Sequence, residues 1–166
     1  MDLRLDSELL QLLELVRELA SGTRVYLVGG AIRDLLLGRP TKDLDFVLPH
    51  GSIQLAKAVS RRLNGAMYTL DDVRHSARVI LRQGEQDDQV LDFTSFIGEN
   101  LEEDLRQRDF TINAMALDLD ALTELIDPLG GEADLEARQI RLGGPDSLTT
   151  DPLRVLRGVR LISSYN

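Results

Sequence analysis

The chain has no cysteine and no tryptophan, and aromatic residues make up only 4% of its 166 residues. The absence of cysteine excludes disulfide bonds and zinc sites with thiolate ligands. No apolar run approaches the roughly 20 residues that a membrane-spanning helix requires, so no membrane partner is expected. The first residues, MDLRLDSELL, lack a basic segment followed by an apolar block and therefore predict no signal peptide. Together these absences favour a cytoplasmic protein.

The chain also has fewer basic than acidic residues. The chain carries 19 Lys and Arg residues against 28 Asp and Glu residues, which gives a net charge of −9. Phosphate contacts come from Lys and Arg, so this balance argues against strong nucleic-acid binding by this chain alone. The arginines are nevertheless clustered toward the C-terminal end, in RQRDF (106–110) and RVLRGVR (154–160).

Apolar residues make up 43% of the chain and charged residues 28%, as in globular proteins, and the length allows one ordinary core. Apolar spacing predicts a helix over 7–22 with Ser7 as its N-cap, and a final helix with Pro152 in its first turn. Further helices are predicted at 31–38, 52–65 and across most of 98–116, and strands at 24–28, 42–48, 77–82, 89–96 and 116–119, with a polar turn at 83–88. This interleaving predicts an α/β or α+β domain in which helices flank one mixed sheet.

Two aspartates lie one residue apart in the predicted strand KDLDFVL (42–48). Residues two apart in a strand project to the same face, so Asp43 and Asp45 point together while Leu44 and Phe46 pack on the other side. Carboxylates held this close repel, and one takes up a proton unless a cation neutralises the pair. Hard oxygen ligands suit Mg²⁺. For an isolated pattern of this kind, a pair of surface aspartates at a strand end is the commoner alternative.

A glycine pair precedes the aspartates along the chain. Gly29 and Gly30 stand where a predicted strand passes into a helix, a place at which free backbone N–H groups and the positive helix end can bind phosphate. A Gly-Gly turn alone is usually only a tight connection. Here the aspartate pair follows within one short helix, and the combination predicts a site for a metal-bound nucleotide.

Three segments in order resemble the motifs of one family. LVGGAIRDLLLG with KDLDFVL, then DLRQRDFTINAMALD, then DPLRVLRGVRL are similar to the class II tRNA nucleotidyltransferases and bacterial poly(A) polymerases, within the wider polymerase-beta-like nucleotidyltransferases. The resemblance covers nearly the whole chain from Val25 to Leu161. It implies a polymerase-beta-like nucleotidyltransferase fold, with a catalytic head domain at 1–150 and the first helix of a following helical neck domain at 151–166.

Members of this family add nucleotides to RNA 3′ ends without a template. The resemblance implies that Asp43 and Asp45 hold two Mg²⁺ ions, which activate the primer 3′ hydroxyl and stabilise charge during in-line attack on the α-phosphate. Asp92, on the next predicted strand, would be a third catalytic carboxylate, although a solvated strand residue is an equal alternative. The triphosphate would be held by Gly29, Gly30, Arg33 and Arg108.

The final predicted helix carries charged residues three apart, at Asp151, Arg154, Arg157 and Arg160. Neighbours in this series lie one helical turn from each other, and a solvated basic face is the simpler interpretation. The resemblance implies instead that these residues bind the nucleotide. Asp151 would accept a hydrogen bond from the exocyclic amine of C or A, and Arg154 would donate to the adjacent ring acceptor. U and G would leave both groups unpaired.

The implied substrates are CTP and ATP, and the implied partner is the 3′ end of tRNA. Only IGENL (97–101) separates VLDFTSF from EEDLRQRDF. Family members that add CCA carry a longer loop here and members that add CC a shortened one, so the sequence favours CC addition. An A-adding enzyme, a poly(A) polymerase and a non-catalytic nucleotide- or RNA-binding module of the same fold are the alternatives. Gln107 and Thr150 depart from the family pattern, which commonly has an arginine and an acidic residue there.

Overall fold

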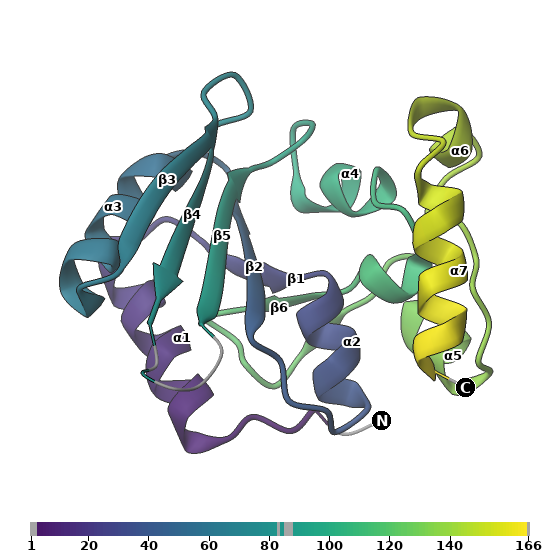
Figure 1. Ribbon diagram of the computed structural model, residues 1–166, viewed down its shortest axis with the longest axis horizontal. Helices are drawn as coiled ribbons and strands as arrows, with labels where there is room; N and C mark the ends of the chain where they lie inside the picture. Colours follow the sequence, from purple (N-terminus) through teal and green to yellow (C-terminus); the bar gives the residue numbers. More distant parts are fainter. Residues whose placement is uncertain (1–2, 83, 85–87, 166) are drawn as a thin grey trace.

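The computed structural model describes residues 3–82, 84 and 88–165. In this part of the chain a seven-stranded sheet has the strand order β3-β4-β5-β2-β1-β6-β7 (Figure 1). Neighbouring strands are antiparallel except for the central pair β2 and β5, which is parallel. The strands are β1 (Tyr26–Val28), β2 (Asp43–Leu48), β3 (Ala66–Asp71), β4 (Ser76–Leu81), β5 (Gln89–Ser95), β6 (Ala116–Asp118) and β7 (Leu125–Ile126).

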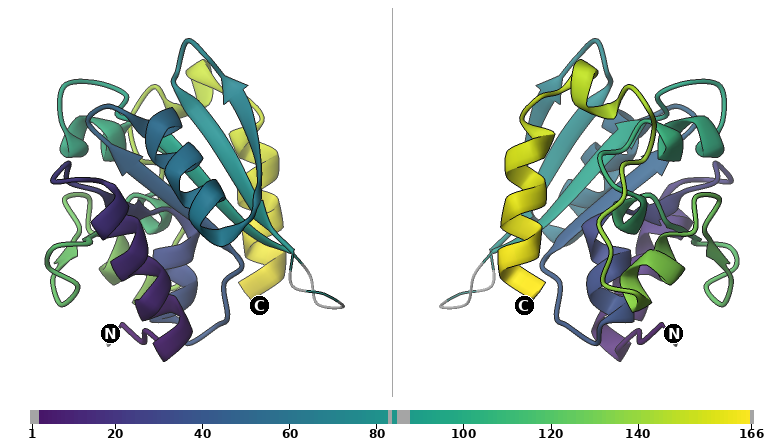
Figure 2. Two further views of the ribbon diagram at one scale, coloured as in Figure 1. Left: turned by 90° about the vertical axis from the view of Figure 1, so that its left-hand side faces the viewer. Right: turned by 90° about the vertical axis from the view of Figure 1, so that its right-hand side faces the viewer.

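Helices connect and cover these strands. They are α1 (Ser7–Leu19), α2 (Gly30–Leu36), α3 (Ser52–Leu63), α4 (Leu101–Arg106), the 3-10 turn η1 (Thr111–Asn113), α5 (Gly131–Glu136), α6 (Ser147–Thr150) and α7 (Arg154–Tyr165). Figure 2 shows α1 and α3 together on one side of the sheet and α7 on the opposite side. None of the helices in the described ranges has the length and apolarity that crossing a bilayer requires.

The two faces of the sheet differ because side chains alternate along each strand. Leu44, Phe46 and Leu48 of β2 belong to the main core with the buried side chains of α1 and α3. The rings of Phe46 and Phe93, from the parallel pair of strands, stack with their centroids 5.0 Å apart. The other face of β2 carries Asp43 and Asp45. The core therefore holds the backbone under both aspartates rigidly.

Most predicted elements are confirmed, with ends that shift by a few residues, but three predictions are wrong. The N-cap of α1 is Asp6, whose carboxylate accepts a hydrogen bond from the Leu9 N–H at 2.8 Å, and not Ser7. Pro152 lies in the turn before α7 rather than in its first turn, since the helix begins at Arg154. Residues 98–116 are helical only at 101–106 and 111–113.

The chain between these two short helical pieces is held by a distant segment. Phe110 is extended and forms a bridge with Leu142, and the Thr111 N–H donates to the Arg141 carbonyl at 2.9 Å. This tertiary pairing overrides the helical pattern. The strands β3 and β7 were not predicted, and the predicted turn at 83–88 lies largely outside the described residues.

Candidate active site

The glycine pair lies against the aspartate-bearing face of the sheet. Gly29 has φ +78° and ψ −145°, a conformation open to glycine and strongly disfavoured for other residues, and it caps the start of α2. A Cβ added to Gly29 would lie 2.9 Å from Asp45 Oδ2 and 3.2 Å from Arg108 Nη1. Backbone, carboxylate and guanidinium therefore approach one another closely, and a larger residue at position 29 would separate them.

Asp45 is the half-buried member of the aspartate pair, and Asp43 is exposed at the start of β2. Burial raises the pKa of the Asp45 carboxyl, and the carboxylates of Asp92 and Asp43 raise it further. The guanidinium groups of Arg108 and Arg78 act in the opposite direction without cancelling the rise. A hard divalent cation fits the donor chemistry of the pair.

Asp92 lies beside Asp45, as the sequence predicts. The parallel register of β2 and β5 pairs the two residues, so both side chains leave the same face of the sheet. Both oxygens of Asp92 are, however, hydrogen-bonded by Arg78 of β4, with Nε to Oδ1 and Nη2 to Oδ2 each at 2.8 Å. Among the described residues no group of three or more His or acidic side chains forms a metal-binding cluster. A metal-ligand role for Asp92 stays a prediction.

Arg33 projects from α2 beside the glycine pair and is almost fully buried. Its Nε and Nη2 donate to the Asp34 carboxylate at 3.0 and 3.1 Å, and its Nη1 donates to Asn113 Oδ1 at 2.5 Å. A Cβ on Gly30 would lie 3.2 Å from Arg33 Nη2. The guanidinium is therefore fixed in orientation next to the backbone at which a phosphate would bind.

Arg108 is held from the opposite side by a buried carboxylate. Its Nε and Nη2 donate to Asp104 Oδ2 at 3.3 and 3.1 Å, while the other oxygen of Asp104 accepts a hydrogen bond from the Ile97 N–H at 3.0 Å. The remaining nitrogen, Nη1, faces Gly29. Asp104 thereby directs Arg108 toward the space above Asp45.

The predicted base-reading pair also comes together, although Asp151 precedes α7 and does not lie within it. Arg154 Nε lies 3.9 Å from Asp151 Oδ2 and is a buried nitrogen with no hydrogen-bond partner. The other two nitrogens of the guanidinium donate hydrogen bonds to residues earlier in the chain. Nη1 donates to the Arg108 carbonyl at 3.2 Å and to Ser147 Oγ at 2.5 Å, and Nη2 donates to the Gln107 carbonyl at 2.8 Å.

Two adjoining hollows of about 630 and 300 Å³ contain most of these groups. Both are lined by Gly30, Asp45, Asp109, Asn113 and Arg157. The larger adds Arg33, Asp43 and Arg160, and the smaller adds Gly29, Arg108 and Arg154. Asp151 borders a neighbouring hollow with Arg154, whereas Asp92 lines none of the three. The combined volume of the first two hollows is within the range of small-molecule sites.

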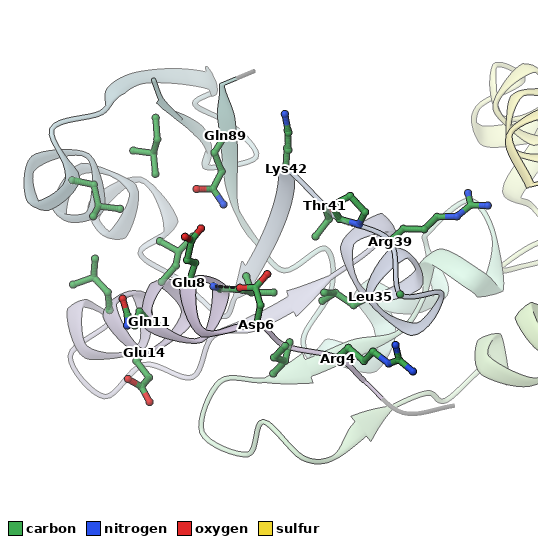
Figure 3. A pocket seen from close by; sticks show the side chains of 18 of the residues that line it. Arg4, Asp6, Glu8, Gln11, Glu14, Leu35, Arg39, Thr41, Lys42 and Gln89 are labelled. Atoms are coloured by element: carbon green, nitrogen blue, oxygen red, sulfur yellow. Dashed lines mark hydrogen bonds between the residues drawn. The ribbon is translucent and has the colours of Figure 1, made fainter. Parts of the chain in front are cut away.

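A larger hollow of about 1060 Å³ lies elsewhere, between α1, the segment before β2 and the ends of β4 and β5 (Figure 3). Its labelled side chains include Arg4, Glu8, Arg39 and Gln89. Its lining includes neither the aspartate pair nor the site arginines Arg33, Arg108, Arg154, Arg157 and Arg160, and most of its leucines belong to the main core or pack against it. Size alone therefore does not mark the candidate site.

The sequence of residues 25–141 matches the poly A polymerase head domain family, and the match covers the glycine pair, the aspartates and Arg108. The chain belongs to this family. Over 136 residues it is 43% identical to a CC-adding tRNA nucleotidyltransferase of Synechocystis. The aligned region covers 81% of this chain and 31% of that protein. It is 40% identical to an A-adding tRNA nucleotidyltransferase of Deinococcus radiodurans, over 84% of this chain and 30% of that protein. The chain thus spans about a third of the length of these relatives.

Solved structures of CCA-adding enzymes confirm the predicted fold class. The Thermotoga maritima CCA-adding enzyme in complex with tRNA superposes with a TM-score of 0.83 at 34% identity, over 96% of this chain and 40% of that chain. A CCA-adding enzyme in complex with CTP gives a TM-score of 0.84 at 33% identity, over 96% of this chain and 41% of that chain. The mixed sheet with flanking helices is therefore the nucleotidyltransferase fold of this head-domain family.

Sequence reasoning missed three polar residues of the head-domain site. Asp104 orients Arg108 from four residues earlier in the chain, and this spacing within the predicted helix was the available signal. Asp109 accepts hydrogen bonds from Asn113 Nδ2 at 3.0 Å and from the Phe110 N–H at 2.8 Å. Asn113 in turn accepts from Arg33. The RDFTIN segment is thus a hydrogen-bonded link between α2 and the C-terminal arginines, for which the sequence alone offered no spacing rule.

Proposed function

We propose that the protein is a template-independent RNA nucleotidyltransferase that transfers CMP from CTP to the 3′ end of tRNA. The observation that carries the proposal is the close approach of Gly29, Asp45 and Arg108 in one hollow. A metal-binding carboxylate pair, backbone N–H groups and a fixed guanidinium are the components that nucleotidyl transfer requires. The relatives and the solved structures are enzymes named for this chemistry, which supports the same activity here.

The triphosphate would lie between α2 and the RDFTIN segment. Arg33 and Arg108 reach this space from opposite sides, each oriented by an acidic neighbour, and Gly30 offers its backbone. Charge-assisted hydrogen bonds to phosphate are the strong kind, and fixed donors lose little entropy when they bind. The arginines would bind the β- and γ-phosphates and so orient pyrophosphate as the leaving group.

Asp43 and Asp45 would hold Mg²⁺, and when bound it supplies charge neutralisation at the α-phosphate and favours the deprotonated primer hydroxyl. Their own contribution is to present two oxygens from one strand face that the core holds in place. Burial raises the pKa of Asp45, and a bound cation would favour its ionised form.

The nucleobase would be read by Asp151 and Arg154. The unpaired Arg154 Nε and the Asp151 carboxylate lie 3.9 Å apart, and this spacing suits a donor and an acceptor on one base edge. Cytosine and adenine offer the complementary amine and ring nitrogen. Arg157 and Arg160, which border the hollow of about 630 Å³, would bind phosphate or the incoming primer.

CC addition is favoured over full CCA addition. Only residues 96–100 connect β5 to α4, which leaves no room for a long loop. The Synechocystis and Geobacter sulfurreducens relatives, at 43% and 42% identity, are both named CC-adding. A-adding and poly(A)-forming activities use the same site chemistry and remain the competing outcomes of the test.

We also propose that residues 1–150 form the catalytic head and that 151–166 begin a helical neck domain. α7 contacts the head through Gly158 and Leu161, which are its buried residues. Leu156, Val159 and Ile162 of α7, and Leu153 just before the helix, are more than half exposed. An amphipathic helix with so much apolar surface suits packing against further helices.

The test is incorporation by the full-length protein on tRNA transcripts that end at the discriminator base, after C, or after CC. CTP and ATP are offered separately and together with Mg²⁺, and products are resolved to single nucleotides. Two additions from CTP and none from ATP are expected. Two additions from CTP together with one A on the CC-ended transcript would make it a CCA-adding enzyme, one A without any C addition an A-adding enzyme, and an A ladder a poly(A) polymerase. Nucleotide binding without incorporation would identify a non-catalytic module.

A further inference from the structure

One half of the sheet has an uncovered face next to the aspartate pair. On the covered face of β4 and β5, Ala77, Val79, Leu91 and Phe93 are fully buried against the helical layer. On the opposite face the alternate residues of the same strands are only partly buried. Figure 2 shows α1 and α3 on the covered side, and in Figure 1 α7 stands beyond α2, away from β3 and β4.

Strand register lines up four side chains across this open face. Tyr68 of β3 pairs with Arg78 of β4, Arg78 pairs with Asp92 of β5, and Asp92 pairs with Asp45 of β2. Directly paired residues leave the same face, so the row runs from the aspartate pair to the sheet edge. Tyr68 is 55% exposed, and the Arg78 side chain is 41% exposed.

The row ends in a tyrosine and an arginine, residue types that can bind single-stranded nucleic acid. An exposed tyrosine ring on a sheet is a stacking platform for a base, and a guanidinium beside it can bind the adjoining phosphate. The bidentate bond to Asp92 fixes the direction of Arg78 and, within the part of the chain that the structure describes, leaves its Nη1 without a hydrogen bond. Arg74, from the turn between β3 and β4, adds a second positive charge at the edge of an adjacent hollow of about 800 Å³.

The spacing of the row matches a short length of RNA. Adjacent strands lie about 4.8 Å apart, so three steps from Asp45 place Tyr68 roughly 14 Å from the aspartate pair. Stacked nucleotides rise by about 3.4 Å each, so Tyr68 would meet a base within about four nucleotides of the reacting 3′ hydroxyl. In tRNA this stretch is the unpaired end of the acceptor arm.

We propose that Tyr68 and Arg78 form the binding surface for the single-stranded 3′ end of the RNA substrate, with Tyr68 stacking on a base and Arg78 binding the backbone. The inference rests on the proposed function and identifies where the second substrate lies. The triphosphate occupies the hollow on one side of Asp45, and the primer crosses the open sheet on the other side. The two substrates then meet at the aspartate pair.

The test compares Tyr68→Ala with Tyr68→Phe, which keeps the ring, and with Val73→Ala as a control at another exposed apolar residue of the same hairpin. Initial rates are measured against tRNA primer and against CTP in separate titrations. Tyr68→Ala is expected to raise the primer KM about tenfold and to leave the CTP KM within about twofold. Tyr68→Phe and Val73→Ala should both resemble the unaltered protein.

A direct measurement of RNA binding tests the proposed surface independently of catalytic activity. A labelled single-stranded RNA that ends at the tRNA discriminator base is titrated without Mg²⁺ or nucleotide, and Tyr68→Ala is expected to weaken its Kd about tenfold. If the unaltered protein transfers no nucleotide, the proposed function fails, and this titration still tests the surface. Equal primer affinity in all variants overturns the inference, as does a rise in the CTP KM alone. A change of oligomeric state in Tyr68→Ala would show that β3 is a protein interface instead.

Discussion

Asp104, whose side chain is 4% exposed, holds the guanidinium of Arg108 through Oδ2 at 3.1 Å and turns its free Nη1 toward Gly29. Asp104 borders the smaller hollow, but its two oxygens are already bonded to Arg108 and to the Ile97 N–H, so its effect on the site passes through the arginine. This relationship makes Arg108 a preorganised donor.

Arg108→Ala should weaken CTP and ATP alike, since the arginine would bind phosphates and not the base. Loss of a charge-assisted hydrogen bond corresponds to about 1.5–3 kcal/mol of binding free energy. Arg106→Ala is the matched control, because Arg106 is exposed and pairs with Glu102 on the same helix. Equilibrium binding of both nucleotides gives the measurement, and loss of affinity for only one of them would assign Arg108 to the base.

Asp43→Ala and Asp45→Ala should each abolish nucleotide transfer and leave the fold intact. Either change removes one ligand of the proposed metal site and relieves repulsion within the pair. Mg²⁺ should raise the Tm of the unaltered protein and have little effect on either variant, because a ligand stabilises only the state that binds it. Transfer near the unaltered rate in either variant would refute the assignment.

The raised pKa of Asp45 predicts a pH effect on stability in the absence of divalent cations. A carboxyl whose pKa is higher in the folded state than in the unfolded state binds its proton more tightly when folded. The stabilisation of the folded state by this tighter proton binding is present in full below about pH 4, the ordinary aspartate range. It is lost as the pH rises through the raised pKa of Asp45. Compared with Asp45→Asn, the unaltered protein should therefore gain Tm as the pH falls through that window in EDTA. A constant difference in Tm would contradict the predicted shift.

Asp151→Asn should reduce discrimination between CTP and UTP about tenfold, because an amide can donate to the carbonyl that uracil presents where cytosine has an amine. This variant is cleaner than any change at Arg154. Arg154 bonds to the carbonyls of Gln107 and Arg108, so its loss would also destabilise the head by about 1–3 kcal/mol. Single-nucleotide incorporation with all four triphosphates measures the ranking. An unchanged ranking at a reduced rate would leave Asp151 as a residue of the turn before α7 only.

Gly29→Ala should reduce activity strongly, and Gly38→Ala provides a matched control. Both glycines have positive φ, at +78° and +67°, but a Cβ at Gly38 meets nothing within 4 Å. The control should therefore show only the backbone penalty of about 1–2 kcal/mol. At Gly29 the added methyl group would also displace Asp45 and Arg108. Thermal unfolding and transfer assays on both variants separate strain from damage to the site.

Local patterns predicted those parts of the fold that depend on local chemistry. The alternation in KDLDFVL correctly separates the core residues of β2 from its aspartates, and the glycine pair correctly marks the passage from β1 to α2. The strand β3 was missed because it follows directly on the Asn64 and Gly65 that end α3, and its AMYTLD sequence is mostly exposed.

Contacts between distant segments could not be predicted in this way. The bidentate pairing of Arg78 with Asp92 depends on the register of the β4–β5 hairpin, which the sequence does not specify by itself. The same holds for Arg154, whose partners are backbone carbonyls of a segment that the sequence predicted to be helical. Sequence motifs identified residues that gather at the site, and the structure assigns the partners that orient them.

The parallel pairing of β2 with β5 has a consequence for how the protein folds. A helix and the β3–β4 excursion lie between these two strands in the chain, so Asp45 and Asp92 meet only through a non-local contact. Such contacts form slowly because a long loop must close before they give any stabilisation. The stacking of Phe46 on Phe93 across the same pair supplies the apolar attraction, while the carboxylates on the reverse face oppose the approach. A divalent cation at the proposed metal site would relieve this opposition and favour the docking of β2 against β5.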